Sequence, residues 1–233
     1  MASEKGSSQP VQLDFHRLLG GRRKGGGRKK SPHSGVSHLK RPVVKRRHPV
    51  HVTLKLLPGL PSLRVQRYAG VVLEALRRGC GGTRREPGRL RVCHCSIQAD
   101  HVHVIVEVED QGALARGIQG LSIRIAKGLN RMLRRKGKVL ADRYHAHVLE
   151  TPGEVRNALA YLFRNWKKHG VKREEMEKPD ELSSGGWFRG WRDYAGREIP
   201  KGVGCSPIVE ARTWLLSVGW ARAGPLVLAE VHA

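Results

Sequence analysis

The chain has 233 residues, which suits one compact domain with extensions, or one domain and a small second one. It carries 44 Lys and Arg against 20 Asp and Glu, and its formal net charge is +24. The positive charges repel one another unless an anionic partner neutralises part of them. Nucleic acid is a commoner partner of this kind than a membrane. No stretch approaches the ~18 apolar residues of a spanning helix. The first residues, MASEKGSSQP, also lack the apolar core of a signal peptide. We therefore expect a cytoplasmic, nucleoid-associated protein with no membrane partner.

Residues 1–47 form the most basic segment, with 13 Lys or Arg and only two acids, Glu4 and Asp14. Gly, Ser and Pro interrupt it, and it has no sustained apolar period. It cannot bury enough apolar surface to fold alone. We predict a disordered basic arm that contacts phosphates without reading sequence, and a solvated tail with no binding role is the alternative.

The next part of the chain contains seven predicted elements in the order strand, helix, strand, strand, helix, strand, helix. They span residues 48–57, 62–78, 89–98, 101–109, 111–136, 138–149 and 152–169. Up to the fourth strand this order is the ferredoxin-like βαββαβ pattern. The sequence thus predicts an α+β fold with an antiparallel sheet, followed by one further helix.

The helix predicted over residues 111–136 has an unbroken basic face. No acid occurs between Gln111 and Ala141, whereas a solvated helix face usually mixes both signs. An unbroken basic face more often lies along phosphates. We therefore predict that six residues bind DNA: Arg116, Arg124, Lys127, Arg131, Arg134 and Arg135.

The strand at residues 101–109 begins with His101-Val102-His103. Residues two apart on a strand point the same way, with Cβ atoms ~7 Å apart, so two imidazoles can close on one divalent ion. Such a pair is a weak signal alone, because His145-Ala146-His147 is a second one and the chain has 12 histidines. For His145 and His147 we favour a polar strand face near the DNA over a second metal site.

The last predicted helix opens with a capping box, Thr151-Pro152-Gly153-Glu154. Tyr161 and Asn165 lie one turn apart on this helix and share a face. Two imidazoles and an amide oxygen suit a hard ion such as Mg²⁺ or Mn²⁺. A phenol, with a pKa near ~10, needs help to deprotonate before it can act as a nucleophile. The alternative is that Tyr161 is a half-buried helix residue with no chemistry.

At these residues the sequence resembles the single-tyrosine HUH transposase superfamily. HVHVIVE at 101–107 is similar to the HUH motif, and YLFRNWKKHG at 161–170 is similar to the helix that carries the tyrosine. HVTLK at 51–55 resembles the first strand of that family, and Arg143-Tyr144 resembles another recurrent pair. The likeness covers roughly residues 48–170. It is greatest to the bacterial REP-associated tyrosine transposases, which act on single-stranded DNA containing small hairpins.

The resemblance implies a metal-dependent enzyme that cuts and rejoins single-stranded DNA through a 5′-phosphotyrosine. Tyr161 would be the nucleophile, and His101, His103 and Asn165 would bind the metal. The catalytic domain would span residues 48–172, with an accessory Trp- and Gly-rich segment and a C-terminal helical tail over 173–233. Relatives include dimers that exchange the tyrosine helix, so a homodimer is one expectation. Trp166 is a departure, since many relatives have Pro there.

Several alternatives stay open. Tyr144 is a rival nucleophile, and the protein could be a domesticated endonuclease that nicks hairpins without moving DNA. It could also be a non-catalytic protein that binds structured RNA or DNA, or a zinc-stabilised structural domain. Trp187, Phe188 and Trp191 could stack on unpaired bases or form local core. Cys93 and Cys95 are expected to be small buried residues on one face of a strand.

Overall fold

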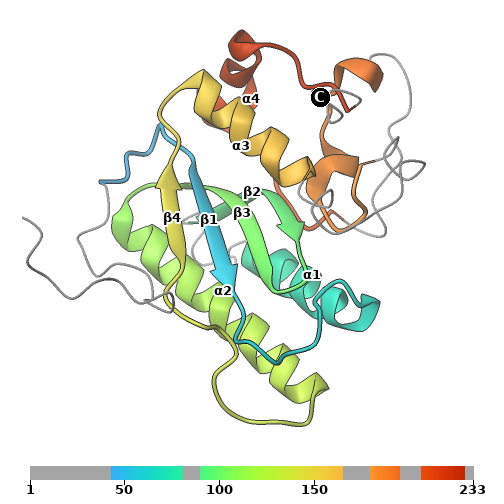
Figure 1. The fold of residues 1–233 in the computed structure, drawn as a ribbon. Helices are drawn as coiled ribbons and strands as arrows, with labels where there is room; N and C mark the ends of the chain where they lie inside the picture. Colours follow the sequence, from blue (N-terminus) through green and yellow to red (C-terminus); the bar gives the residue numbers. More distant parts are fainter. Residues whose placement is uncertain (1–42, 81–89, 165–178, 195–205, 229–233) are drawn as a thin grey trace, which may run out of the picture. The chain divides into compact units, whose positions relative to one another are not determined.

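A four-stranded antiparallel sheet lies at the centre of the computed structural model, which describes residues 43–80, 90–164, 179–194 and 206–228 (Figure 1). Its strands are β1 (Val50–Lys55), β2 (Leu90–Ile97), β3 (His101–Val108) and β4 (His145–Val148), in the order β2-β3-β1-β4. Helix α1 (Gln66–Cys80) connects β1 to β2, and α2 (Gln111–Met132) connects β3 to β4. The predicted α+β fold with ferredoxin-like topology is confirmed.

One face of this sheet is apolar and packs against α1 and α2. The residues that alternate along β1 pair with those along β3, so Val52 lies opposite Val104 and Leu54 lies opposite Val102. All four side chains are buried in one core, with the apolar stripe of α2: Leu114, Ile118, Leu121, Ile125 and Leu129. The predicted alternation of β3 is therefore confirmed.

Two glycines let α2 approach its neighbours closely. A Cβ added at Gly117 would lie 2.6 Å from the Cβ of Leu90 on β2. A Cβ added at Gly128 would lie 2.4 Å from Cγ1 of Val71 on α1. Both contacts are closer than real carbon atoms pack, so these positions exclude any larger side chain without local movement.

The other face of the sheet carries a second core, built on α3 (Pro152–Arg164). In Figure 1, α3 lies on the side of the sheet opposite to α1 and α2. The described chain beyond α3 contains α4 (Trp214–Ser217) and three short 3₁₀ helices: η4 (Ser184–Trp187), η5 (Arg192–Tyr194) and η6 (Gly219–Ala223). Of these, α4 and η6 contact α3. Phe163 of α3 contacts Phe188 and Trp191, whose exposed fractions are 7% and 2%. This burial favours local core over base stacking for these two residues.

The capping box at the start of α3 is confirmed. The backbone N–H of Glu154 donates to the Thr151 hydroxyl at 3.2 Å, and the Glu154 carboxylate accepts from the backbone N–H groups of Glu150 and Thr151 at 2.7 and 2.9 Å. These bonds satisfy donors that an uncapped first turn would leave open. They also lower the pKa of Glu154.

Two local predictions differ from the structure. The strand expected over residues 138–149 is reduced to the four residues of β4. Before it, the Asp142 carboxylate accepts from the N–H of Arg143 at 2.7 Å, a local bond that competes with strand pairing. The expectation that Cys93 and Cys95 share a face is wrong. A register shift between Val92 and His94 places Cys95 in the first core and Cys93 in the second, although both residues are buried as expected.

None of the helices in the described part of the chain combines the length and the apolar composition needed to cross a bilayer.

Candidate active site

Five histidines of β1, β3 and β4 share the sheet face on which α3 packs. The pairing register puts them there, because antiparallel partners point to the same side. Thr53 lies opposite His103 on β3 and His145 on β4, while His51 lies opposite His147. Lys55 lies opposite His101. The central strand β1 thus brings the two HxH pairs of the sequence to one surface.

His101 and His103 lie close enough to share a ligand. Their ring centroids are 4.6 Å apart, and the rings are nearly perpendicular at 85°. Nδ1 of His101 bonds the Asp100 carboxylate at 2.6 Å, and Nδ1 of His103 lies 3.1 Å from the hydroxyl of Thr53. An ion would therefore be bound through Nε2 of both rings. Metal-binding histidines usually engage a carboxylate or other polar group through the second ring nitrogen, as these two do.

Asp100 is ionised at neutral pH. Its partial burial would raise its pKa, but the hydrogen bond from His101 and the nearby charge of Lys55 outweigh burial and lower the pKa. An ionised carboxylate at this position accepts an N–H from Nδ1 of His101. It thereby selects the tautomer whose Nε2 carries a lone pair for a ligand.

His51 is a third imidazole within this site. Its Nε2 lies 3.2 Å from Nδ1 of His103. Burial lowers its pKa to about 4, with further lowering from the charges of His147 and His145. The ring is therefore neutral at pH 7 and can take part in the hydrogen bond to His103. It orients His103 together with Thr53.

Tyr161 lies against these imidazoles from the side of α3. Its ring centroid is 5.1 Å from that of His103 and 6.0 Å from that of His51, in edge-on contacts. The helix neighbours Leu162 and Phe163 are fully buried in the second core, whereas Tyr161 is 39% exposed. The helix therefore fixes the phenol beside the histidine pair and leaves it accessible to a substrate.

The residues at this site suit a divalent ion in part. Two imidazoles with oriented second nitrogens form a common donor set for such an ion. The predicted third ligand, Asn165, lies outside the described residues. Within the described ranges no group of three or more His, Cys, Asp and Glu side chains surrounds one point. The third donor therefore stays a prediction.

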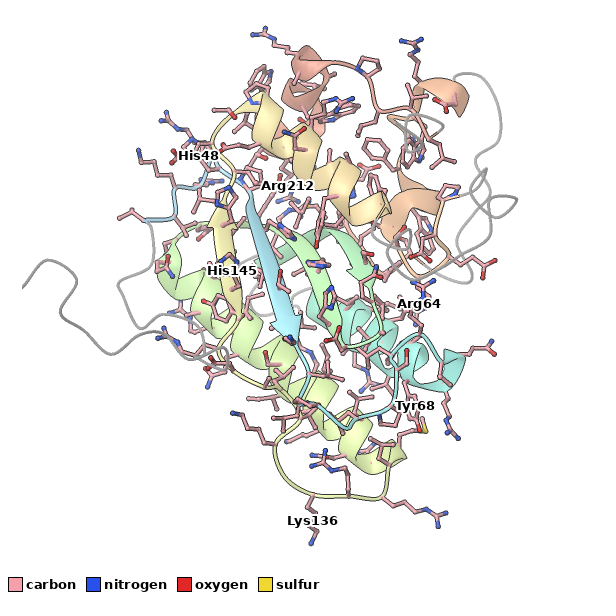
Figure 2. All side chains as sticks on the ribbon, in the orientation of Figure 1. His48, Arg64, Tyr68, Lys136, His145 and Arg212 are labelled. Carbon is pink, nitrogen blue, oxygen red and sulfur yellow. The ribbon has the colours of Figure 1, made fainter. Side chains whose placement is uncertain are left out.

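The six basic residues predicted to bind DNA lie on α2 or just beyond it, on the side of the sheet opposite to the histidine pair. Most of their side chains are exposed, but Arg124 packs toward α1, where Nε lies 3.4 Å from the carbonyl of Ala75. Arg134 and Arg135 follow the helix. Figure 2 shows the neighbouring Lys136 at the end of the molecule away from Arg212. DNA that touches both α2 and the histidines would have to pass around an edge of the sheet.

The rival nucleophile, Tyr144, packs against the first core, on the face away from His101 and His103. His145 and His147 are exposed on edge strand β4, where His145 is labelled in Figure 2. His147 lies 3.8 Å from the Glu154 carboxylate. Their exposure fits the predicted polar strand face.

Sequence reasoning missed three residues of the site: His51, Thr53 and Asp100. The alternation of His51, Val52 and Thr53 already indicated one polar face for β1. Which strands would lie beside β1, and in which register, depends on contacts between distant parts of the chain. The sequence pattern alone did not contain that information.

No family model matches the sequence, and no curated protein matches it. Among solved structures, a REP-associated tyrosine transposase bound to a REP hairpin is similar with a TM-score of 0.47 and 14% identity, over 76% of this chain and 96% of that one. A bacterial tRNA(His) guanylyltransferase-like protein is similar in its complex with ATP, with a TM-score of 0.40 and 10% identity, over 58% of this chain and 66% of that one. Its complex with GTP gives 0.38 and 15%, over 54% and 65%. These are distant structural likenesses and assign no activity.

Proposed function

We propose that this protein cuts and rejoins single-stranded DNA that contains hairpins, with Tyr161 as the nucleophile and a divalent metal at His101 and His103. The observation that carries the proposal is the placement of the phenol. A half-exposed tyrosine ring lies 5.1 Å from the second histidine of an HxH pair whose rings are oriented by Asp100, Thr53 and His51.

The proposed reaction is a transfer of one phosphodiester. A divalent ion bound to the two imidazoles would withdraw charge from the non-bridging oxygens of the scissile phosphate. The Tyr161 phenol loses its proton and attacks phosphorus, and the bond from phosphorus to the 3′ oxygen breaks. The leaving 3′ oxygen takes up a proton, and the 5′ end of the downstream strand stays on the tyrosine.

The second half of the reaction reverses the first. A 3′ hydroxyl attacks the phosphotyrosine, the bond to the Tyr161 oxygen breaks, and the phenol takes up a proton. One phosphodiester is exchanged for another, so no nucleotide triphosphate is consumed. The structural contribution of the chain is to hold Tyr161 and the histidine pair in one place, which lowers the entropic cost of the attack.

The test is a covalent adduct. Full-length protein is mixed with labelled hairpin-bearing single-stranded DNA and Mn²⁺, and the mixture is run on a denaturing gel. We expect an adduct with the wild-type protein and none with Tyr161→Phe. The matched control is Tyr144→Phe, which removes the same hydroxyl on the opposite face of the sheet and should leave the adduct. An adduct that survives Tyr161→Phe would overturn the assignment of the nucleophile.

The metal proposal is tested on the same gel. His101→Ala combined with His103→Ala should abolish the adduct, while His145→Ala combined with His147→Ala should not. Chelation with EDTA should abolish the adduct as well, but it should change the melting temperature of the protein by no more than a few degrees. A large loss of thermal stability on chelation would favour the zinc-stabilised structural domain instead.

A second candidate is a nucleic-acid-binding protein without catalysis, which the net charge of +24 favours. It predicts tight binding of hairpin DNA or RNA, no adduct under any condition, and no effect of Tyr161→Phe. A hairpin-nicking endonuclease would form the adduct but would not transfer it to an added strand with a 3′ hydroxyl.

A further inference from the structure

A second polar site lies at the opposite end of β3 from the histidine pair. A cavity of about 360 Å³ opens there, and it is lined by Arg46, Arg47, Arg91, Glu107, Val108, Glu109, Arg212 and Thr213. We call it the arginine cavity. Its lining comes from the segment before β1, from β2, from the end of β3 and from the segment before α4. Figure 2 shows Arg212 in this upper part of the molecule.

The charge of one of its two acids is already balanced. The Glu107 carboxylate is 5% exposed and pairs with Arg91 at 3.2 Å. It also accepts from the backbone N–H groups of Arg212 and Thr213, at 2.8 and 2.7 Å, and from the Thr213 hydroxyl at 2.8 Å. These bonds saturate its acceptor capacity and fix the segment that carries Arg212 at the cavity.

The remaining charge of the cavity is positive. Neither Arg46 nor Arg212 forms an ion pair with a described residue through its guanidinium, and the Nε atom of Arg47 donates to His48 rather than to an acid. Glu109 is the only other carboxylate of the lining. Three guanidinium groups therefore face one carboxylate once the Arg91–Glu107 pair is set aside. An anion placed there would gain charge-assisted hydrogen bonds.

The size and the donors of the arginine cavity suit a nucleotide. Its volume falls within the ~300–1,000 Å³ of small-molecule sites. Guanidinium groups match phosphate oxygens in a two-pronged arrangement. Glu107 and His103 point to the same face of the sheet four residues apart on β3, a distance of about 13 Å along the strand. The same DNA strand can therefore reach both sites.

We propose that the arginine cavity binds one phosphate-bearing nucleotide of the single-stranded DNA, through the guanidinium groups of Arg46 and Arg212. The inference rests on the proposed function for the identity of the strand. The cavity would hold the strand at a fixed distance from Tyr161, and it would do so independently of the basic face of α2.

The test compares binding by Arg46→Gln combined with Arg212→Gln against a matched control, Arg67→Gln combined with Arg189→Gln. The control removes two exposed arginines that do not line the cavity. Binding of a labelled oligothymidylate is measured in EDTA, so that no cleavage occurs, over a range of salt concentrations. We expect the cavity variant to bind roughly tenfold more weakly, and its slope of log affinity against log salt to shrink by about 0.7, for the loss of one neutralised phosphate.

Equal affinities and slopes for the cavity variant and the control would overturn the proposal. The phosphate could belong to a DNA strand or to a free nucleotide, and competition with thymidine monophosphate distinguishes these two sources. If it binds the wild type but not the cavity variant, while oligothymidylate binds both equally, the site serves a free nucleotide and the strand assignment is wrong. Failure of the proposed function appears elsewhere, as the absence of a Tyr161 adduct, so the two failures are distinguishable.

Discussion

Glu107 joins the sheet to the C-terminal segment through a single buried carboxylate. Substitution by Gln keeps the shape but leaves Arg91 unpaired, and it turns an amide N–H₂ toward donors at Arg212 and Thr213. Removal of one partner from a buried ion pair costs about 3–5 kcal/mol. We therefore expect Glu107→Gln to lower the free energy of unfolding by about 3 kcal/mol in urea denaturation.

The control for that substitution is Glu109→Gln, the same chemical change two residues along the chain at an exposed position. It should alter the free energy of unfolding by no more than about 0.5 kcal/mol. If both variants lose the same amount, the hydrogen bonds of Glu107 do not hold the C-terminal segment in place.

His94 makes stability depend on pH. It is buried against Phe163 and Phe188, and this burial lowers its pKa from 6.5 to about 3. The unfolded chain therefore binds a proton that the folded chain does not between these two values. Stability is complete above pH 6.5 and falls as the pH drops below it, with a slope that approaches about 1.4 kcal/mol per pH unit.

Urea denaturation at a series of pH values checks this expectation. The wild type should lose stability more steeply below pH 6.5 than His94→Gln, in which the titrating group is absent. His145→Gln, at an exposed position on β4, should keep the wild-type slope. Parallel profiles for the wild type and His94→Gln would contradict the prediction.

At the residue scale, the sequence predicted what depends on local spacing. Residues two apart on a strand share a face, so the nearness of His101 and His103 was predictable and is confirmed at 4.6 Å. The contact of Tyr161 with His103 was inferred from the family resemblance rather than from spacing, because the two residues are 58 positions apart in the chain. His51 was missed because its position depends on strand pairing.

At the scale of elements, the packing of α2 depends on Gly117. A methyl group there would lie 2.6 Å from Cβ of Leu90, an atom that moves only with the backbone of β2. Gly117→Ala should therefore lower the free energy of unfolding by roughly 1–3 kcal/mol despite the higher helix propensity of alanine. Gly120→Ala, whose new methyl group would lie 3.5 Å from the Arg124 guanidinium, should instead raise it by about 0.5–1 kcal/mol. Thermal denaturation of both variants distinguishes the two signs.

Elements with strong local signals were predicted well. The capping box fixed the start of α3, and the alternating valines fixed β3 and its faces. The bulge at Cys93 has no such signal, because an extra residue in one strand is defined by its partner strand. The short length of β4 was missed for a related reason, since the pattern of residues 138–149 allowed a longer strand.

At the scale of the molecule, the two faces of the sheet carry different groups of residues. Its apolar face, with α1 and α2, holds the larger core, and its other face holds the histidines and Tyr161. The predicted DNA-binding residues of α2 lie on the side of the sheet that holds the larger core. The arginine cavity lies at the far end of β3, on the side that holds the histidines and Tyr161. Positive charge is thus present on both sides of the sheet.

The helix that bears Tyr161 is anchored along its outer side. Arg156 donates to the backbone carbonyls of Gly224 and Pro225 at 3.2 and 2.7 Å, and Phe163 packs against the rings of Phe188 and Trp191. Exchange of this helix between two copies would require all of these contacts to break first. We therefore expect Tyr161 and the histidine pair of one site to come from one polypeptide. A mixture of Tyr161→Phe protein with His101→Ala/His103→Ala protein should form no adduct on the denaturing gel. An adduct formed by the mixture would mean that Tyr161 of one copy acts with the histidines of another. The contacts of Arg156 and Phe163 would then have to break during exchange of the helix.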